Sequence, residues 1–193
     1  KAEHEIIADR IVAGTYIIAA LMLNSTLEIN NFNTIYLKSL IDILKKMGAK
    51  LKVSKNSIKV FQGSKLKSTS LSTSPYPGFP TDLQAQLMVL MTQANGLSKI
   101  QENIFENRFM HVPELKRMGA KIIIKNKTAY IYGPNKLTGA EVMATDLRAS
   151  VSLVLAGLIA DNRTVVNRIY HLDRGYEFLE EKLKKCKAKI KRI

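Results

Sequence analysis

Thr145-Asp146-Leu147-Arg148 opens the mostly apolar run 149–160, ASVSLVLAGLIA, and this pairing of an acidic residue with an apolar helix decides the fold. The same opening stands at Ala8-Asp9-Arg10 and at Thr81-Asp82-Leu83. An amphipathic helix ends 38 residues after Asp9, 36 residues after Asp82 and 40 residues after Asp146. In that order, the three helix ends are Met47-Gly48-Ala49-Lys50, Met118-Gly119-Ala120-Lys121 and Cys186-Lys187-Ala188-Lys189. Nearly constant spacing indicates one supersecondary unit used three times.

Periodicity predicts the order of elements within a unit. The first helix is apolar on nearly all sides, as in residues 11–23, which is typical of a buried helix. A β-rich run follows, then a second helix with a narrow apolar stripe, then two strands around a polar turn and a third short strand. The β-rich runs are 26–32, 97–105 and 163–170; the paired strands are 51–53 with 58–61 and 122–124 with 130–132; the third strands are 68–73 and 140–144.

Three units of this kind pack most simply around a shared helical core, with the sheets outside. If the three apolar helices run in the same direction, their aspartate-marked N-termini meet at one end. Helix dipoles converging there would favour a phosphate or a carboxylate. Arg108, Arg148 and Arg174 lie at or near the starts of elements, where they could make bidentate contacts to such groups.

Composition limits the class of protein. A chain of 193 residues with 46% apolar residues has enough material for one substantial core. The net charge of +14 favours an anionic partner, although scattered lysines on solvated faces explain most of it. One cysteine excludes a disulfide framework and fits a reducing compartment. The apolar runs are shorter than the roughly 20 residues that span a bilayer, so no membrane partner is expected.

Several segments are more specific than a repeat requires. They are PYPGFPTDLQAQ at 75–86, FENRFMHVPEL at 105–115, VMATDLRAS at 142–150 and RIYHLDRGYE at 168–177, together with HEIIADRIVAGT at 4–15. In this order they closely resemble the C-terminal half of the UDP-N-acetylglucosamine 1-carboxyvinyltransferase family, and the resemblance covers essentially the whole chain. We therefore expect residues 1–193 to form a single C-terminal domain with repeats at about 9–74, 75–144 and 145–193, the last one truncated, and the N-terminal catalytic domain to be absent.

The resemblance implies an α/β fold, an inside-out α/β barrel domain with inner apolar helices and outer sheets. It also implies transfer of enolpyruvyl from phosphoenolpyruvate to the 3-hydroxyl of UDP-N-acetylglucosamine, with release of phosphate through a tetrahedral intermediate. That reaction begins bacterial peptidoglycan synthesis in the cytoplasm. Both substrates are anions, the family needs no cofactor or metal, and its active site lies between two similar domains. The chain alone is therefore expected to be inactive.

Asp82 matches the family carboxylate that contacts the sugar 3-hydroxyl and is proposed as its general base. A hydroxyl that attacks must lose its proton to an acceptor within hydrogen-bond distance. The alternative is that Asp82 only stabilises a helix N-terminus, which contributes about 0.3–1 kcal/mol. Asp9 and Asp146 occupy equivalent repeat positions without that family role, so the structural alternative applies more strongly to them.

Arg148 and Arg174 match the arginines that hold phosphoenolpyruvate, where a planar guanidinium suits carboxylate or phosphate. The alternative is an exposed or weakly paired arginine. Arg108, in the Glu-Asn-Arg motif, is a lesser candidate whose alternative is a structural pair with Glu106. Ile104 matches a position whose backbone contacts the nucleotide sugar, whereas pattern alone makes it an apolar strand residue.

The remaining reactive side chains are expected to be structural. His111 and His171 have no second metal ligand at useful spacing, which argues against zinc, and both are expected to be satisfied structural histidines. Cys186 aligns with Met47 and Met118 and is expected to be buried. It does not match the family's general-acid cysteine, which belongs to the other half of the enzyme.

Two alternative functions remain at this point. One is the related transfer of enolpyruvyl to shikimate 3-phosphate, which uses the same fold; binding of a nucleotide sugar would separate the two. The other is a basic nucleic-acid-binding module, which the charge supports and the absence of a recognised binding motif opposes.

Overall fold

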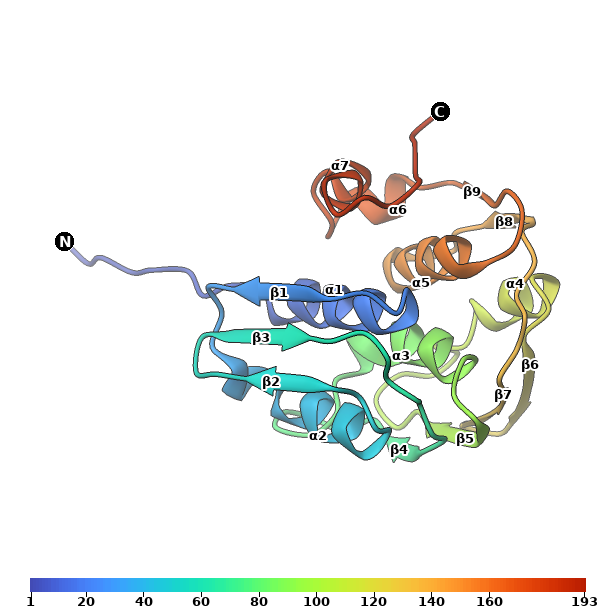
Figure 1. Ribbon diagram of the computed structural model, residues 1–193, viewed down its shortest axis with the longest axis horizontal. Coiled ribbons are helices and arrows are strands. Elements are labelled where there is room, and N and C mark those ends of the chain that lie inside the picture. The colour runs from blue at the N-terminus through green and yellow to red at the C-terminus, as the bar shows by residue number, and fades with distance from the viewer.

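The computed structural model describes all residues, 1–193, and places three helices at the centre with sheets around them (Figure 1). The central helices are α1 (Arg10–Met22), α3 (Gln84–Met91) and α5 (Leu147–Ile159). The first repeat continues with β1 (Leu27–Asn30), the 3-10 helix η1 (Thr34–Leu37), α2 (Lys38–Lys46), β2 (Leu51–Val53) and β3 (Ser57–Val60). Residues 1–9, before α1, have no regular structure and are exposed.

The second and third repeats follow the same order. β4 (Ser70–Ser72) leads into the second, which consists of the 3-10 helix η2 (Thr81–Leu83), α3, β5 (Gly96–Gln101), α4 (Val112–Arg117), β6 (Lys121–Lys125) and β7 (Thr128–Gly133). β8 (Glu141–Met143) leads into the third, which consists of α5, β9 (Val165–Asn167), α6 (Tyr170–Asp173) and α7 (Leu179–Lys185). Every strand and helix predicted from periodicity is therefore present. β1, β4, β5, β8 and β9 are shorter than predicted, whereas β6 and β7 are longer.

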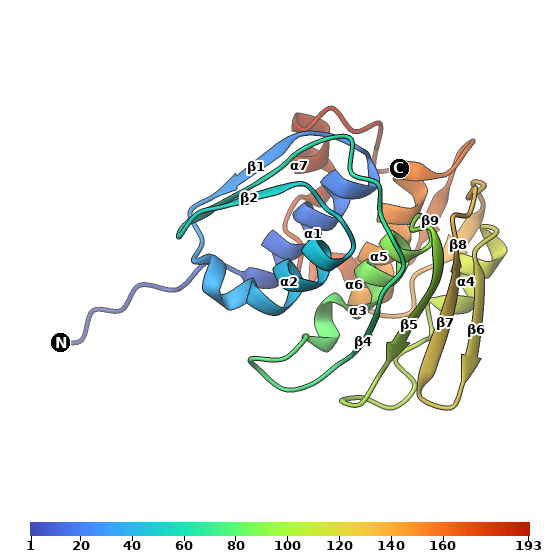
Figure 2. The same ribbon diagram turned by 60° about the horizontal axis from the view of Figure 1, so that its bottom comes forward.

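The strands form three separate sheets. β1, β3 and β2 form an antiparallel sheet in the order β1-β3-β2, in which Ile29 faces Ile58. The second sheet has the order β4-β5-β7-β6, with β4 parallel to β5 and the others antiparallel, and its strands lie side by side in Figure 2. The third consists of parallel β8 and β9. The parallel pairs β4-β5 and β8-β9 occupy corresponding places in their repeats.

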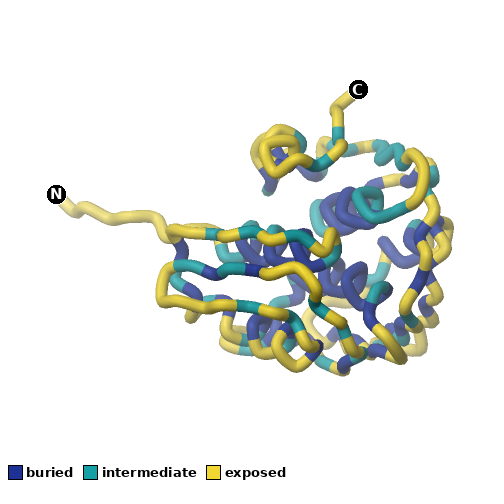
Figure 3. Tube along the Cα trace, viewed as in Figure 1, coloured by how far each residue is buried: buried dark blue, intermediate teal, exposed yellow.

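The central helices are buried because no face of them is polar. All eight residues of α3 are buried, and the buried stretches of α1 and α5 appear as dark blue in Figure 3. Full burial of a large apolar side chain stabilises the fold by about 1.5–3 kcal/mol, so these helices hold most of the core. In contrast, α2 buries only Leu40, Ile41 and Leu44, as its predicted stripe requires.

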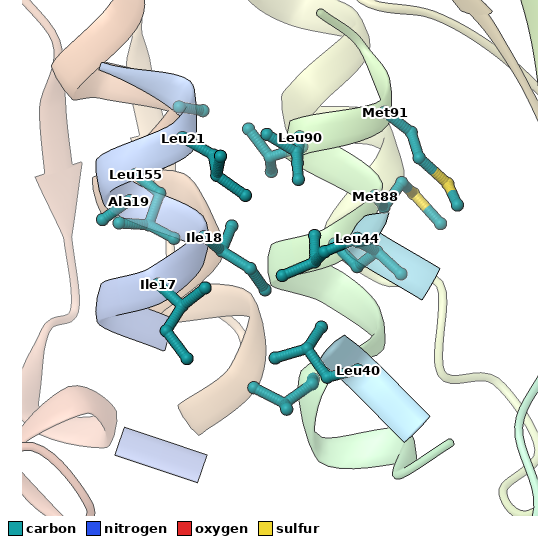
Figure 4. Close-up of a cluster of buried hydrophobic side chains, with 14 of the residues drawn as sticks. Ile17, Ile18, Ala19, Leu21, Leu40, Leu44, Met88, Leu90, Met91 and Leu155 are labelled. Carbon is teal, nitrogen blue, oxygen red and sulfur yellow. The ribbon is translucent and has the colours of Figure 1, made fainter. Parts of the chain in front are cut away.

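The helices α1 and α3 run in the same direction. Ile17 and Leu21 on α1 advance the same way as Met88 and Met91 on α3 in Figure 4. The two helices approach closely at Gly14, where an added Cβ would lie 2.7 Å from a Leu83 methyl carbon. Because Gly14 has no side chain, the η2 segment can pack directly against α1. This packing determines the position of Asp82, which lies in η2.

The expectation for Cys186 was wrong. Met47 and Met118 are fully buried, but Cys186 is exposed. In the first two repeats the chain returns over the helix end, since the Lys67 amide donates to the Met47 carbonyl and the Thr138 amide to the Met118 carbonyl, each at 2.8 Å. No backbone group donates to the Cys186 carbonyl, so nothing covers the end of α7.

Candidate functional site

The three repeat-equivalent aspartates differ in what they do. Asp9 caps α1, accepting hydrogen bonds from the amides of Ile11 and Val12, and Asp146 caps α5 by accepting from Arg148 and Ala149. Asp82 caps nothing: η2 precedes α3, and its N-cap position is Pro80. Capping therefore describes Asp9 and Asp146 but not Asp82, which lies in the first turn of η2, where an acidic side chain still interacts favourably with the helix dipole.

Asp82 lies between two guanidinium groups. Its Oδ1 is 2.9 Å from Nη2 of Arg108 and 3.0 Å from Nε of Arg148. The side chains are partly exposed, at 40% for Asp82, 23% for Arg108 and 19% for Arg148. Asp82 Oδ2 accepts no hydrogen bond from the protein. One carboxylate oxygen is thus fixed by the arginines while the other can accept a proton or a hydrogen bond from a ligand.

Each of the three side chains is positioned by a different element. Arg148 lies in the first turn of α5, whose start is fixed by the Asp146 cap. Arg108 lies in the loop between β5 and α4, with its guanidinium 4.8 Å from the Phe105 ring centroid. The expected alternative of a pair with Glu106 was wrong, since Arg108 pairs with Asp82 instead. Two positive charges against one negative charge leave a net positive cluster that suits an anionic ligand.

Arg174 does not join this cluster. It is exposed, forms the C-cap of α6 and makes no side-chain hydrogen bond or ion pair within the chain. Its neighbour Gly175 packs against Leu147, because an added Cβ there would lie 2.8 Å from the Leu147 Cδ2 atom. Arg174 is therefore held beside the first turn of α5, which carries Arg148, with its guanidinium free.

Ile104 is not a strand residue. β5 ends at Gln101, and Ile104 lies beyond it with 37% of its surface exposed. Its amide donates a hydrogen bond to Oε1 of Glu102 at 2.9 Å. The interpretation of Ile104 as an apolar strand residue was therefore wrong, because the buried carboxylate of Glu102 turns the backbone away from the sheet.

Glu102 is a buried residue that sequence reasoning missed. Only 2% of its surface is exposed, yet it forms no ion pair. The alternation of inward residues along β5, Ser98 and Ile100, continues to position 102. A glutamate at an inward position of a strand was the available signal, because an acidic side chain is rarely buried without a specific reason.

A second polar group links the central helices. The Tyr176 hydroxyl lies 2.8 Å from Thr15 Oγ1, and Nε2 of Gln86 lies 3.3 Å from both hydroxyls. Gln86 Nε2 also donates to the Asp82 carbonyl at 3.0 Å. Burial raises the pKa of Tyr176, while its hydrogen bond to Thr15 acts in the opposite direction. These contacts join α1, α3 and the segment after α6 directly behind Asp82.

The two histidines have different environments. His111 is 2% exposed, and its Nε2 is buried without a hydrogen-bond partner, so the expectation of a satisfied histidine was wrong for it. Burial lowers the pKa of His111 to about 4; the Asp146 carboxylate opposes the shift and Arg108 adds to it. His171 is half-buried, with its ring 4.1 Å from the Tyr170 ring.

A cavity of about 660 Å³ lies away from the arginine cluster. It is formed by α5, β9, α7 and residues 189–193, and its lining includes Leu158, Val166 and Leu179. None of the five predicted site residues lines it. No helix of the chain combines the length and the apolar character needed to cross a bilayer.

Comparisons with known proteins identify the family of the chain. The family profile described as EPSP synthase (3-phosphoshikimate 1-carboxyvinyltransferase) matches residues 1–183. The UDP-N-acetylglucosamine 1-carboxyvinyltransferase of Pelagibacter ubique is 56% identical over 193 residues, which are 100% of this chain and 46% of that protein. The protein of the same name from Desulfosudis oleivorans is 55% identical over 188 residues, 97% of this chain and 45% of its own length.

Solved structures share the fold. The enolpyruvyl transferase NikO from Streptomyces tendae superposes with a TM-score of 0.88 at 30% identity, covering 96% of this chain and 44% of that one. EPSP synthase from Acinetobacter baumannii gives a TM-score of 0.67 at 15% identity over 86% of this chain and 40% of its own, which shows the fold alone. The chain spans about half the length of the relatives it matches. It belongs to the carboxyvinyltransferase family of EPSP synthase, and its similarity to UDP-N-acetylglucosamine 1-carboxyvinyltransferases extends over its whole length.

Proposed function

We propose that residues 1–193 are the C-terminal domain of a UDP-N-acetylglucosamine 1-carboxyvinyltransferase acting in the bacterial cytoplasm. In this proposal the domain is one inside-out α/β barrel with three pseudo-symmetric repeats at about 9–74, 75–144 and 145–193. The N-terminal domain closes the site and supplies the general acid. The observation that carries the proposal is the Asp82 carboxylate with one oxygen held by two arginines and the other unbonded, in a chain 56% identical to such an enzyme.

The chemistry assigned to Asp82 is general-base catalysis. The 3-hydroxyl of UDP-N-acetylglucosamine would donate to Oδ2, and its proton would pass to the carboxylate as the oxygen attacks C2 of phosphoenolpyruvate. Oδ1 is occupied by the two guanidinium groups, so Oδ2 is the oxygen available to accept that proton.

Arg148 and Arg174 are assigned to phosphoenolpyruvate. They lie on neighbouring turns, since Gly175 packs against Leu147, and a guanidinium holds a phosphate or carboxylate through two parallel hydrogen bonds. As phosphate leaves the tetrahedral intermediate, these positive charges stabilise the charge that develops on it. Ile104 is exposed and precedes Phe105, whose ring contacts the Arg108 guanidinium. It is assigned to the nucleotide sugar through its backbone.

The proposal is tested by phosphate release. The chain alone, a separately produced N-terminal domain, and the mixture are each given UDP-N-acetylglucosamine and phosphoenolpyruvate. We expect release only from the mixture, abolished by Asp82→Asn and retained by Asp42→Asn, which removes an exposed carboxylate on α2 that pairs with Lys38. Turnover by the chain alone, no turnover from assembled domains, or turnover with shikimate 3-phosphate in place of the nucleotide sugar would each refute it.

A further inference from the structure

The Glu102 carboxylate is buried at the end of β5 with neutral partners only. Its Oε1 accepts from Thr73 Oγ1 at 2.7 Å, from the Ile104 amide at 2.9 Å and from the Phe105 amide at 3.2 Å. Its Oε2 accepts from Thr81 Oγ1 at 2.9 Å. Removing a carboxylate from water costs several kcal/mol, and four donors aimed at two oxygens compensate that cost. The four donors thus form a binding site for an anion, and the anion that occupies it is the Glu102 carboxylate.

The donors come from three segments that surround the candidate site. Thr73 follows β4, Thr81 begins η2, and Ile104 and Phe105 begin the loop after β5. Thr81 immediately precedes Asp82 in the chain, so its hydroxyl ties the start of η2 to Glu102. Three loops that are distant in sequence are therefore fixed to one another by a single residue.

The same residue fixes both partners of the Asp82–Arg108 ion pair. On one side it holds Thr81, next to Asp82. On the other it holds the amide of Phe105, whose ring stacks on the Arg108 guanidinium at 4.8 Å. The backbone at Ile104 lies between these two contacts. A shift of Glu102 would thus displace the carboxylate and the backbone assigned to the acceptor sugar together.

We propose that Glu102 is a positioning residue that sets the acceptor half of the site, holding Asp82 and the Ile104 backbone in register for the sugar hydroxyl. This inference rests on the proposed function. Glu102 contacts neither Arg148 nor Arg174, and its carboxylate is bonded to Thr73, Thr81, Ile104 and Phe105. It reaches Arg148 only indirectly, through Asp82. Loss of its charge should therefore impair use of the acceptor more than the affinity for phosphoenolpyruvate.

The informative substitution is Glu102→Gln. With its oxygen at the Oε1 position it keeps three acceptor contacts, and its amide nitrogen can donate to Thr81 Oγ1 once that hydroxyl rotates. The Thr81 hydroxyl hydrogen loses its acceptor, which costs less than leaving a buried charge unpaired, so the fold should persist. Hydrogen bonds to a carboxylate are roughly twice as strong as neutral ones, so the three segments become less firmly held. Thr81→Val removes the link to η2 from the other side.

The kinetic test uses the assembled two-domain enzyme. For Glu102→Gln we expect kcat to fall about 10-fold, as small misplacements near a reacting group produce, with KM for UDP-N-acetylglucosamine raised more than KM for phosphoenolpyruvate. Thr81→Val should give part of the same pattern, and the double variant should lose less than the two effects combined. Ser98→Ala is the control, because Ser98 is equally buried on the same strand. It should lower thermal stability without changing either KM.

A second measurement needs only this chain. Hydrogen exchange of the Ile104 and Phe105 amides, followed by NMR, should be about 10-fold faster in Glu102→Gln, because the bonds that protect them weaken. Exchange of the Ile131 amide in β7 should be unchanged. Wild-type kinetics in Glu102→Gln, equal changes in both KM values, or unchanged exchange would each overturn the inference. If wild-type domains assemble without turnover, the proposed function fails, while the exchange experiment still decides whether Glu102 holds these segments.

Discussion

Oδ1 of Asp82 lies 3.0 Å from Nε of Arg148, which joins the start of η2 to the first turn of α5 across 66 positions of the chain. The second and third repeats therefore meet at their N-terminal helix ends. Arg108 completes the contact from the loop after β5. The cluster depends on the packing of whole repeats against one another, and no single segment could form it alone.

Neutralising Asp82 should strengthen anion binding while removing catalysis. In Asp82→Asn the arginines lose their internal anion, so the affinity of this chain for inorganic phosphate should rise up to about two-fold, as removal of up to about 0.5 kcal/mol of partly exposed competing ion pairing implies. Calorimetric titration with phosphate, against Asp42→Asn as control, measures the change. Weaker binding by Asp82→Asn would show that Asp82 organises the arginines rather than competing with the ligand.

Replacing Arg148 by lysine should impair phosphoenolpyruvate binding although the charge is kept. A lysine offers a point charge in place of a planar group that donates two parallel hydrogen bonds. We expect KM for phosphoenolpyruvate in the assembled enzyme to rise about 10-fold, equivalent to about 1.4 kcal/mol. Arg117→Lys, at an exposed position on α4, is the matched control. An unchanged KM would remove Arg148 from the phosphoenolpyruvate site.

The capping aspartates should contribute more to stability than Asp82 does. Asp9→Ala and Asp146→Ala each remove a side chain that accepts from two backbone amides, at a typical cost of about 1 kcal/mol. Asp82→Asn caps no helix and should cost under about 0.5 kcal/mol. Urea unfolding of the three variants gives the comparison. An equal loss in all three would contradict the distinction between caps and site.

The stability of the fold should decrease in mild acid because of His111. Its pKa is about 4 in the folded chain because it is buried, against about 6.5 when unfolded. Between these pH values the unfolded state therefore binds more protons than the folded state. The contribution of His111 to the free energy of unfolding is complete above about pH 6.5 and falls by about 3 kcal/mol as the pH approaches 4. Unfolding free energies for wild type and His111→Leu across this range test it.

The replacement should flatten that part of the curve, since leucine cannot titrate and needs no partner for a buried nitrogen. His171→Gln serves as the control, because His171 is half-buried and near the surface. It should leave the slope in place. A slope that survives in His111→Leu would assign the acid sensitivity to other groups.

Removing the Tyr176 hydroxyl should destabilise the junction of the central helices. Tyr176→Phe loses its hydrogen bond to Thr15 and leaves the Gln86 amide with fewer acceptors, which costs about 1–2 kcal/mol. Tyr132→Phe is the control, since Tyr132 is 42% exposed on β7. Thermal unfolding of both variants should show a loss only for Tyr176→Phe.

Most of the fold could be predicted because it depends on local patterns repeated three times. The apolar runs gave the buried helices, and alternation gave the strands. The direction of packing was an assumption, and the parallel course of α1 and α3 agrees with it. The expectation for Cys186 failed because its burial depends on a covering segment, as at Met47 and Met118, and not on the stripe itself.

The site could be predicted only in part, because its geometry depends on contacts between loops. Pattern marked Asp82, Asp9 and Asp146 alike, and only the 3-10 turn before α3 separates the first from the others. Glu102 and the unbonded nitrogen of His111 give no periodic signal, since their significance lies in what surrounds them. The roles of Asp82, Ile104, Arg108, Arg148 and Arg174 stay predictions until the variants are measured.

The apolar interior is divided unequally, and this has a consequence for motion. One cluster contains 36 buried residues from the first two repeats and α5, whereas α6, α7 and the facing side of α5 share a cluster of six. A unit with so few apolar contacts opens at a lower free energy than the rest. The segment that carries Arg174 should therefore open locally, without global unfolding, more often than the three central helices do.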